Sequence, residues 1–133
     1  MKIGIVGQGY VGTAIKVGFE SYYDLETYDK YSEEKSTMQL ADLVESCEVI
    51  FVCVPTPMNK DGSCNIDVVE GVIKQINKVL TDWKSDKRPI VVIKSTVPPG
   101  TTEKLHKKFK NVNVIFNPEF LTEANFIEDF KNQ

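Results

Sequence analysis

The 133-residue sequence lacks the features that mark several classes of protein. No apolar run approaches the roughly 20 residues of a membrane-spanning helix. No signal-peptide cleavage site precedes the first strand-like segment, so a cytoplasmic protein with no membrane partner is expected. The net charge of -3 gives no electrostatic reason to bind nucleic acid.

Cysteine and histidine are also scarce. The three cysteines, Cys47, Cys53 and Cys64, are odd in number and widely spaced, which argues against a disulfide framework and matches no zinc site. Each is therefore interpreted as a reduced, structural thiol, and no metal is predicted. His106 is the single histidine and lies among lysines, which is typical of a solvated helix residue.

The sequence does contain short β-branched runs that alternate with amphipathic stretches, without a linker or repeat. This alternation predicts one α/β domain over residues 1–133, a Rossmann-type doubly wound parallel sheet. A strand order of 3-2-1-4-5 is expected, with a last strand missing from the sequence. The predicted strands span 2–7, 25–29, 48–54, 89–95 and 112–117, and the predicted helices span 11–22, 38–46, 66–83, 101–110 and 123–131.

A glycine-rich turn follows the first predicted strand. The run Gly7-Gln8-Gly9-Tyr10-Val11-Gly12 lies between a strand and a helix, as a dinucleotide-binding fingerprint requires. Gly7 permits the tight turn, Gly9 lets the backbone approach a pyrophosphate, and Gly12 lets the helix pack closely on the strand. Phosphates would then bind the N–H groups of the helix N-terminus, although glycines that only relieve strain would give the same pattern.

An acidic residue closes the second predicted strand. Asp29 lies about 20 residues after the turn, where an acid accepts hydrogen bonds from the adenosine ribose. Because a carboxylate would repel the 2′-phosphate of NADP, NAD is the predicted cofactor. Lys30 or Lys35 could weaken this repulsion, and a solvated loop acid is the simpler interpretation of Asp29 taken alone.

Two proline-containing loops follow the third and fourth predicted strands, "VPTP" at 54–57 and "KSTVPPGT" at 94–101. Ligands of open parallel sheets bind beyond the carboxyl ends of the strands. The prolines fix the course of each loop, and the hydroxyls of Thr56, Ser95 and Thr96 are expected to face the cleft. Turn chemistry would explain either loop alone, whereas their equivalent positions favour a shared site.

The segment "NPEFLTEA", residues 117–124, carries two carboxylates after the fifth predicted strand. A carboxylate at Glu119, partly desolvated by Phe120, would suit proton transfer near neutral pH. The alternative is that Glu119 and Glu123 are helix-start acids that complement the helix dipole.

The motifs "GQGYVG", "VPTPMNKDGS", "KSTVPPGTT" and "NPEFLTEA" occur in an order and spacing that resemble the UDP-glucose 6-dehydrogenase family, within the UDP-glucose/GDP-mannose dehydrogenase group. These enzymes oxidise a sugar-nucleotide CH₂OH to a carboxylate in two NAD-dependent steps through a cysteine thioester, and they supply polysaccharide biosynthesis. The resemblance implies the N-terminal NAD-binding domain of such an enzyme. It also implies a UDP-glucose or GDP-mannose class substrate, and a homo-oligomer is possible.

The resemblance assigns roles to individual residues. The implied cofactor-binding residues are Gly7, Gln8, Gly9, Tyr10, Val11, Gly12, Asp29, Val54, Pro55, Thr56, Ser95, Thr96, Val97 and Glu123. The implied catalytic residues are Thr96, which positions water, Glu119, the acid/base in thioester hydrolysis, and Glu123, near the nicotinamide. The implied substrate wall comprises Glu119, Phe120, Leu121 and Thr122.

The sequence departs from the family pattern in two respects. The connection from Asp29 to Val49 lacks the longer helical insertion of the family, which leaves the identity of the sugar open. The nucleophilic cysteine and catalytic lysine of the family lie in a later portion, so this chain is expected to bind NAD without turnover. The alternatives are a stand-alone NAD-binding module without catalysis and another two-domain NAD dehydrogenase, of the 3-hydroxyacid or 6-phosphogluconate type.

Overall fold

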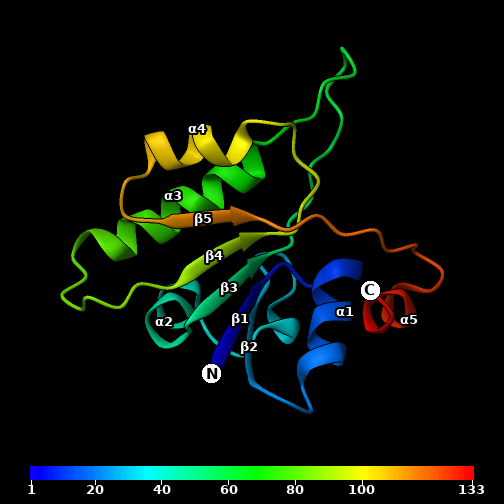
Figure 1. Ribbon diagram of the computed structural model, residues 1–133, viewed down its shortest axis with the longest axis horizontal. Coiled ribbons are helices and arrows are strands. Elements are labelled where there is room, and N and C mark those ends of the chain that lie inside the picture. The colour runs from blue at the N-terminus through cyan, green and yellow to red at the C-terminus, as the bar shows by residue number, and fades with distance from the viewer.

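The computed structural model describes residues 1–133 and contains one five-stranded parallel sheet with helices on both faces (Figure 1). The parallel α/β class predicted from the alternating pattern is confirmed. The strands are β1 (Lys2–Val6), β2 (Asp24–Tyr28), β3 (Val49–Val52), β4 (Ile90–Ile93) and β5 (Asn113–Phe116). The helices are α1 (Tyr10–Phe19), α2 (Leu40–Ser46), α3 (Asp67–Thr81), α4 (Thr101–Lys108) and α5 (Phe126–Lys131), with a short 3-10 helix at Glu33–Lys35.

The main core lies between the sheet and the helices α2, α3 and α4. The α3 stripe predicted from its helical period is buried, with Val69, Ile73, Ile76 and Leu80 fully enclosed. Each such aliphatic side chain stabilises the fold by roughly 1.5–3 kcal/mol through removal of its surface from water. A smaller cluster on the other face joins α1 and α5 to β1, where Phe19 and Phe130 pack edge to face.

The strand order is β2-β1-β3-β4-β5, so the predicted order 3-2-1-4-5 is wrong. The third strand pairs with β1 on the side opposite β2. The physical reason lies in the side chains: β3 is apolar throughout and buries Ile50 and Val52 completely, which requires neighbours on both sides. The sequence of β2, with Asp24 and Glu26, suits an edge. In the six-stranded order 3-2-1-4-5-6, the third strand lies outside the second. Here the short connection between β2 and β3 contains no strand, so β2 forms the edge of the sheet.

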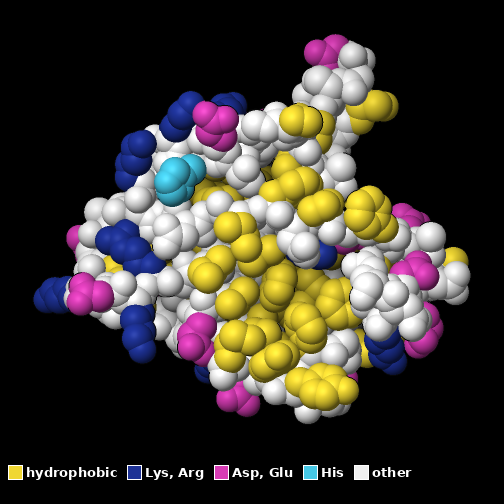
Figure 2. All heavy atoms as spheres, in the orientation of Figure 1, with side chains coloured by type: hydrophobic (Ala, Val, Ile, Leu, Met, Phe, Trp, Pro, Cys, Tyr) yellow, Lys and Arg dark blue, Asp and Glu magenta, His cyan; other side chains and the backbone are white.

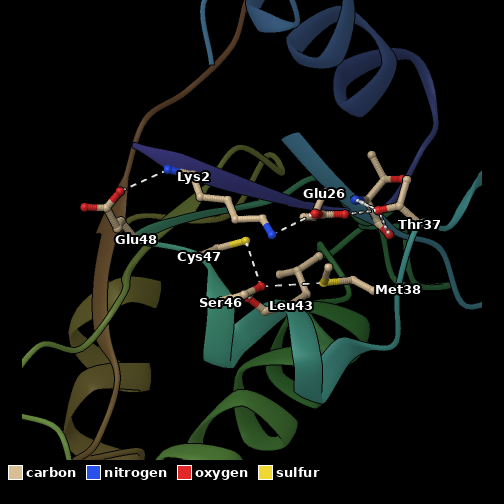
Figure 3. Close-up of polar contacts among 9 residues, drawn as sticks. Lys2, Glu26, Thr37, Met38, Leu43, Ser46, Cys47 and Glu48 are labelled. Atoms are coloured by element: carbon tan, nitrogen blue, oxygen red, sulfur yellow. Dashed lines mark hydrogen bonds and ion pairs between the residues drawn. The ribbon is translucent and has the colours of Figure 1, made fainter. Parts of the chain in front are cut away.

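A polar network fastens the amino-terminal side of the sheet (Figure 3). The Lys2 ammonium lies 2.8 Å from Glu26 Oε1, and the Thr37 hydroxyl donates to Glu26 Oε2 at 2.6 Å. The backbone N–H of Lys2 donates to Glu48 Oε2 at 2.9 Å, which joins the starts of β1 and β3. Since ligands of parallel sheets bind at the opposite, carboxyl ends, this network is structural.

Helices α1 and α5 leave part of their sheet face uncovered. Figure 2 shows hydrophobic side chains gathered over this face. Ile90 of β4 and Ile115 of β5 are exposed, Ile115 to 50%. None of the helices has the length and apolar character that a membrane crossing demands.

Candidate functional site

A cleft of about 500 Å³ opens at the carboxyl ends of the strands. Because every strand of the sheet is parallel, all five strand exits meet at one edge. Its volume lies within the range typical of ligand sites, about 300–1,000 Å³. The lining residues come from all five exits and are Gly7, Gln8, Gly9, Tyr10, Val11, Asp29, Tyr31, Lys35, Cys53, Val54, Pro55, Thr56, Lys94, Ser95, Thr96 and Glu119.

The three glycines of the first turn each have the geometry that their predicted roles require. Gly7 has φ +92°, and a Cβ there would lie 2.7 Å from the Cys53 carbonyl oxygen. A Cβ on Gly12 would lie 1.9 Å from the Gly7 oxygen, so close strand–helix packing depends on its absence. Around Gly9 no atom lies within 4 Å of a Cβ position, which leaves the backbone open to a ligand.

The N-terminus of α1 completes a phosphate-binding cradle. The helix begins at Tyr10 with Gly9 as its N-cap, no side chain caps it, and its first turn contains no acidic residue. Free N–H groups at the positive end of a helix attract anions. Together with the open space at Gly9, this arrangement fits the pyrophosphate of a dinucleotide, as the sequence predicts.

The carboxylate of Asp29 is fixed at the edge of the cleft by backbone groups. Its Oδ2 accepts a hydrogen bond from the Gln8 N–H at 2.7 Å, and its Oδ1 accepts one from the Tyr31 N–H at 2.9 Å. The Lys35 ammonium donates to the Gln8 carbonyl at 3.4 Å, so this cation lies beside the glycine turn. The acid that is expected to bind ribose thereby also holds the turn in place.

A second pocket, of about 310 Å³, adjoins the cleft between the end of β2 and α3. Its α3 wall, formed by Asp67, Val68, Gly71, Val72 and Gln75, was missed by sequence reasoning, which assigned the apolar stripe of α3 to the core alone. Gly71 is the signal that could have revealed it, because a glycine inside a helix often marks a close approach. No atom lies within 4 Å of a Cβ position on Gly71.

The three predicted cofactor residues in the loop after β4 have different surroundings. Ser95 lines the cleft, and its hydroxyl donates to the Val54 carbonyl at 2.6 Å, a bond that joins the exits of β3 and β4. Thr96 is exposed and lines the cleft with Thr56. Val97 packs against the main core instead of lining the cleft.

Of the segment at 117–124, only Glu119 lines the cleft. Its Oε2 accepts the Leu121 N–H at 2.6 Å. Phe120, expected to shield Glu119 from water, is 81% exposed, so that expectation is wrong. The Thr122 hydroxyl donates to Asp129, and Glu123 is exposed outside the cleft. Helix α5 begins at Phe126 instead of residue 123, so neither glutamate lies in its first turn.

The cysteines and the histidine contribute one residue to the cleft. Cys47, Cys53 and Cys64 are all free thiols, and only Cys53 lines the cleft. Burial raises the pKa of the Cys53 thiol far above its ordinary value, so it stays neutral and unreactive. His106 is exposed on α4, as predicted, and no group of three metal-ligating side chains is present.

Three relatives are similar to this chain in sequence. The family model described as "UDP-glucose/GDP-mannose dehydrogenase family, NAD binding domain" matches residues 25–133. A UDP-glucose 6-dehydrogenase of Pseudomonas aeruginosa is 37% identical over 106 residues, 71% of this chain and 22% of the relative. A UDP-glucose 6-dehydrogenase of Streptococcus pneumoniae is 29% identical, with 97% of this chain and 38% of the relative covered. A GDP-mannose 6-dehydrogenase of Pseudomonas putida is 29% identical, with 97% and 31% covered.

Solved structures agree on the fold. A UDP-glucose dehydrogenase from Pyrobaculum islandicum matches with a TM-score of 0.79 and 27% identity, over 97% of this chain and 38% of that one. A GDP-mannose dehydrogenase from Pseudomonas aeruginosa matches with a TM-score of 0.80 at 24% identity, over 98% and 38%. The chain therefore spans between 22% and 38% of the length of these relatives.

Proposed function

We propose that this chain, which belongs to the UDP-glucose/GDP-mannose dehydrogenase family, provides the NAD site of an enzyme that oxidises the CH₂OH of a nucleotide sugar to a carboxylate. The chain is an NAD-binding domain of that family, whereas the reaction of the whole protein is the proposal. The observation that supports it is the cleft, in which residues of all five strand exits meet beside the glycine turn.

The residues of the cleft and the adjoining pocket fit the parts of NAD. The N–H groups at the start of α1 would hold the pyrophosphate, and the Asp29 carboxylate would accept the hydroxyls of the adenosine ribose. The adenine would enter the second pocket, against Tyr31 and the open backbone of Gly71. Bound NAD supplies the hydride acceptor, and its nicotinamide end would lie toward Thr56 and Thr96.

We assign the proton and water chemistry to the two cleft residues beside that end. Thr96 would position a water molecule through its hydroxyl, and Glu119 would exchange protons with it. Support for these roles is their shared place in the wall of the cleft. The roles of Phe120, Leu121 and Thr122 as a substrate wall, the role of Glu123 near the nicotinamide, and a homo-oligomeric state stay predictions.

The 133-residue chain alone should bind the cofactor without turning over substrate, since none of its cysteines matches the motif that the family resemblance requires for the thioester. Purified chain incubated with NAD and UDP-glucose or GDP-mannose should produce no NADH absorbance. Measurable production would show that a nucleophile had been misassigned.

Isothermal titration calorimetry of the folded chain with NADH tests the cofactor site directly. Saturable heat is expected with NADH, and a weaker response is expected with NADPH because its 2′-phosphate would meet Asp29. Absence of heat at millimolar NADH, in protein whose folding is confirmed by circular dichroism, would contradict the proposal. NADH binding without any activity in a longer chain that includes the later portion would favour a binding module.

A further inference from the structure

Lys94, the residue directly after β4, is a buried lysine that lines the cleft but has no role in the site as described above. It is 3% exposed, and none of the ion pairs in the chain involves it. Its Nζ donates to Asn117 Oδ1 at 2.9 Å and lies 3.5 Å from the Pro118 carbonyl oxygen. Burial of an ammonium group among neutral oxygens is costly, so an apolar side chain would be the cheaper way to fill this position.

The exit of β4 is joined to its neighbours on both sides. The Ser95 hydroxyl donates to the carbonyl of Val54, in the loop after β3. On the other side, Lys94 holds the side chain of Asn117, and the Asn117 N–H donates to the Ile93 carbonyl at 3.1 Å. Two consecutive residues of one strand exit therefore connect three of the loops that form the cleft.

The ionisable groups that face Lys94 are Cys53, which follows β3, and Glu119, which follows β5. Burial lowers the pKa of Lys94 below its ordinary value, and the negative charges that Cys53 and Glu119 acquire on ionisation oppose that change. The Cys53 thiol is neutral because burial raises its pKa. Glu119 is thus the carboxyl group of the cleft wall that favours the protonated form of Lys94, and no ion pair joins the two residues.

We propose that Lys94 is a positioning residue whose ammonium group fastens the Asn117–Pro118 turn to the end of β4 and thereby keeps Glu119 in the wall of the cleft. This inference rests on the proposed function, because it concerns the cleft in which Glu119 acts. It explains the retention of a buried cation where a neutral side chain would suffice for packing.

The substitution Lys94→Met tests this role, because methionine keeps most of the aliphatic length and removes the ammonium group. In NMR relaxation measurements on the chain without ligand, backbone order parameters for residues 117–121 should fall from about 0.85 toward 0.6. Those of the glycine turn should stay as in the wild type. Asn117→Ala, which removes the acceptor, should produce the same loosening, and Lys104→Met on the exposed side of α4 should produce none.

A pH titration separates the charge from the packing of the side chain. Lys94 is protonated below its lowered pKa, so the turn should be ordered below that pKa and loosen as the pH rises through a midpoint below the ordinary lysine value of 10.5. This alkaline transition should be absent from Lys94→Met. If the Lys94 side chain only fills space, neither the wild type nor any variant should show this transition.

Wild-type order at residues 117–121 in Lys94→Met would overturn the inference, and if that variant does not fold, wild-type order in Asn117→Ala would do so. Titration of NADH into the same samples separates this outcome from failure of the proposed function. If Lys94→Met loosens the turn but the wild-type chain does not bind NADH, the cofactor site is rejected and the role of Lys94 is retained. If the wild-type chain binds NADH but Lys94→Met leaves the order of residues 117–121 unchanged, the role of Lys94 is rejected.

Discussion

Replacement of Gly9 by alanine should abolish most cofactor affinity while leaving the fold intact. Gly9 is the N-cap of α1 and has an extended backbone with φ −77° and ψ −156°, so its φ lies in the negative range that alanine also adopts. No atom of the protein lies within 4 Å of the added Cβ. The methyl group would therefore occupy only the space through which the pyrophosphate is expected to approach the backbone.

The expected magnitudes follow from this geometry. A hydrogen bond from a backbone N–H to a charged phosphate oxygen contributes about 1.5–3 kcal/mol. Loss of one such bond weakens NADH binding by about 10- to 100-fold, because 1.4 kcal/mol corresponds to a factor of ten. The free energy of unfolding should fall by only about 1 kcal/mol, because alanine is a poorer N-cap than glycine but no side-chain cap is lost.

Calorimetry with NADH and urea unfolding of the same samples measure both quantities. Gly12→Ala provides the contrast, because its Cβ would lie 1.9 Å from the Gly7 oxygen and must displace helix or turn. That variant should lose stability by about 1–3 kcal/mol or more. Unchanged NADH affinity in Gly9→Ala, with the fold preserved, would refute the assignment of this turn to the pyrophosphate.

Two further predictions concern charged residues. Asp29→Ala should weaken NADH binding about tenfold by loss of a charged hydrogen bond. It should also narrow the preference for NADH over NADPH, because the repulsion of the 2′-phosphate disappears. A preference that stays unchanged in competition calorimetry would contradict this reasoning. Hydrogen bonds from Lys2 and Thr37 lower the pKa of Glu26 below its ordinary value of 4.5, so its stabilising effect is present above that pH and is lost as the pH falls through the lowered pKa. Glu26→Gln should therefore reduce the thermal midpoint at pH 7 and flatten its decline in acid, whereas Glu48→Gln, at a mostly exposed position, should change it less.

The elements that could be predicted from the sequence are those whose signals are local. The buried stripe of α3 follows from side chains one helical turn apart, and the strong apolar runs identify β3 and β4 without reference to the rest of the chain. The roles of Gly7, Gly9 and Gly12 likewise follow from a turn of six residues. For the same reason, the predicted cofactor residues 7–11 of that turn line the cleft, whereas the predicted substrate residues 120–122 and Glu123 do not.

The sequence alone determined the class of the sheet, the phosphate-binding turn and the acidic residue Asp29 at the end of the second strand. Each of these depends on backbone geometry or periodicity within a short segment. Only the tertiary structure decided that β3 lies beside β1, that the Ser95 hydroxyl turns to Val54, and that Phe120 is left in solvent. It also decided that Lys94 meets Asn117. These features depend on which strand exits become neighbours, a choice made by burial over the whole sheet, and side chains distant in sequence acquire partners only after it is made.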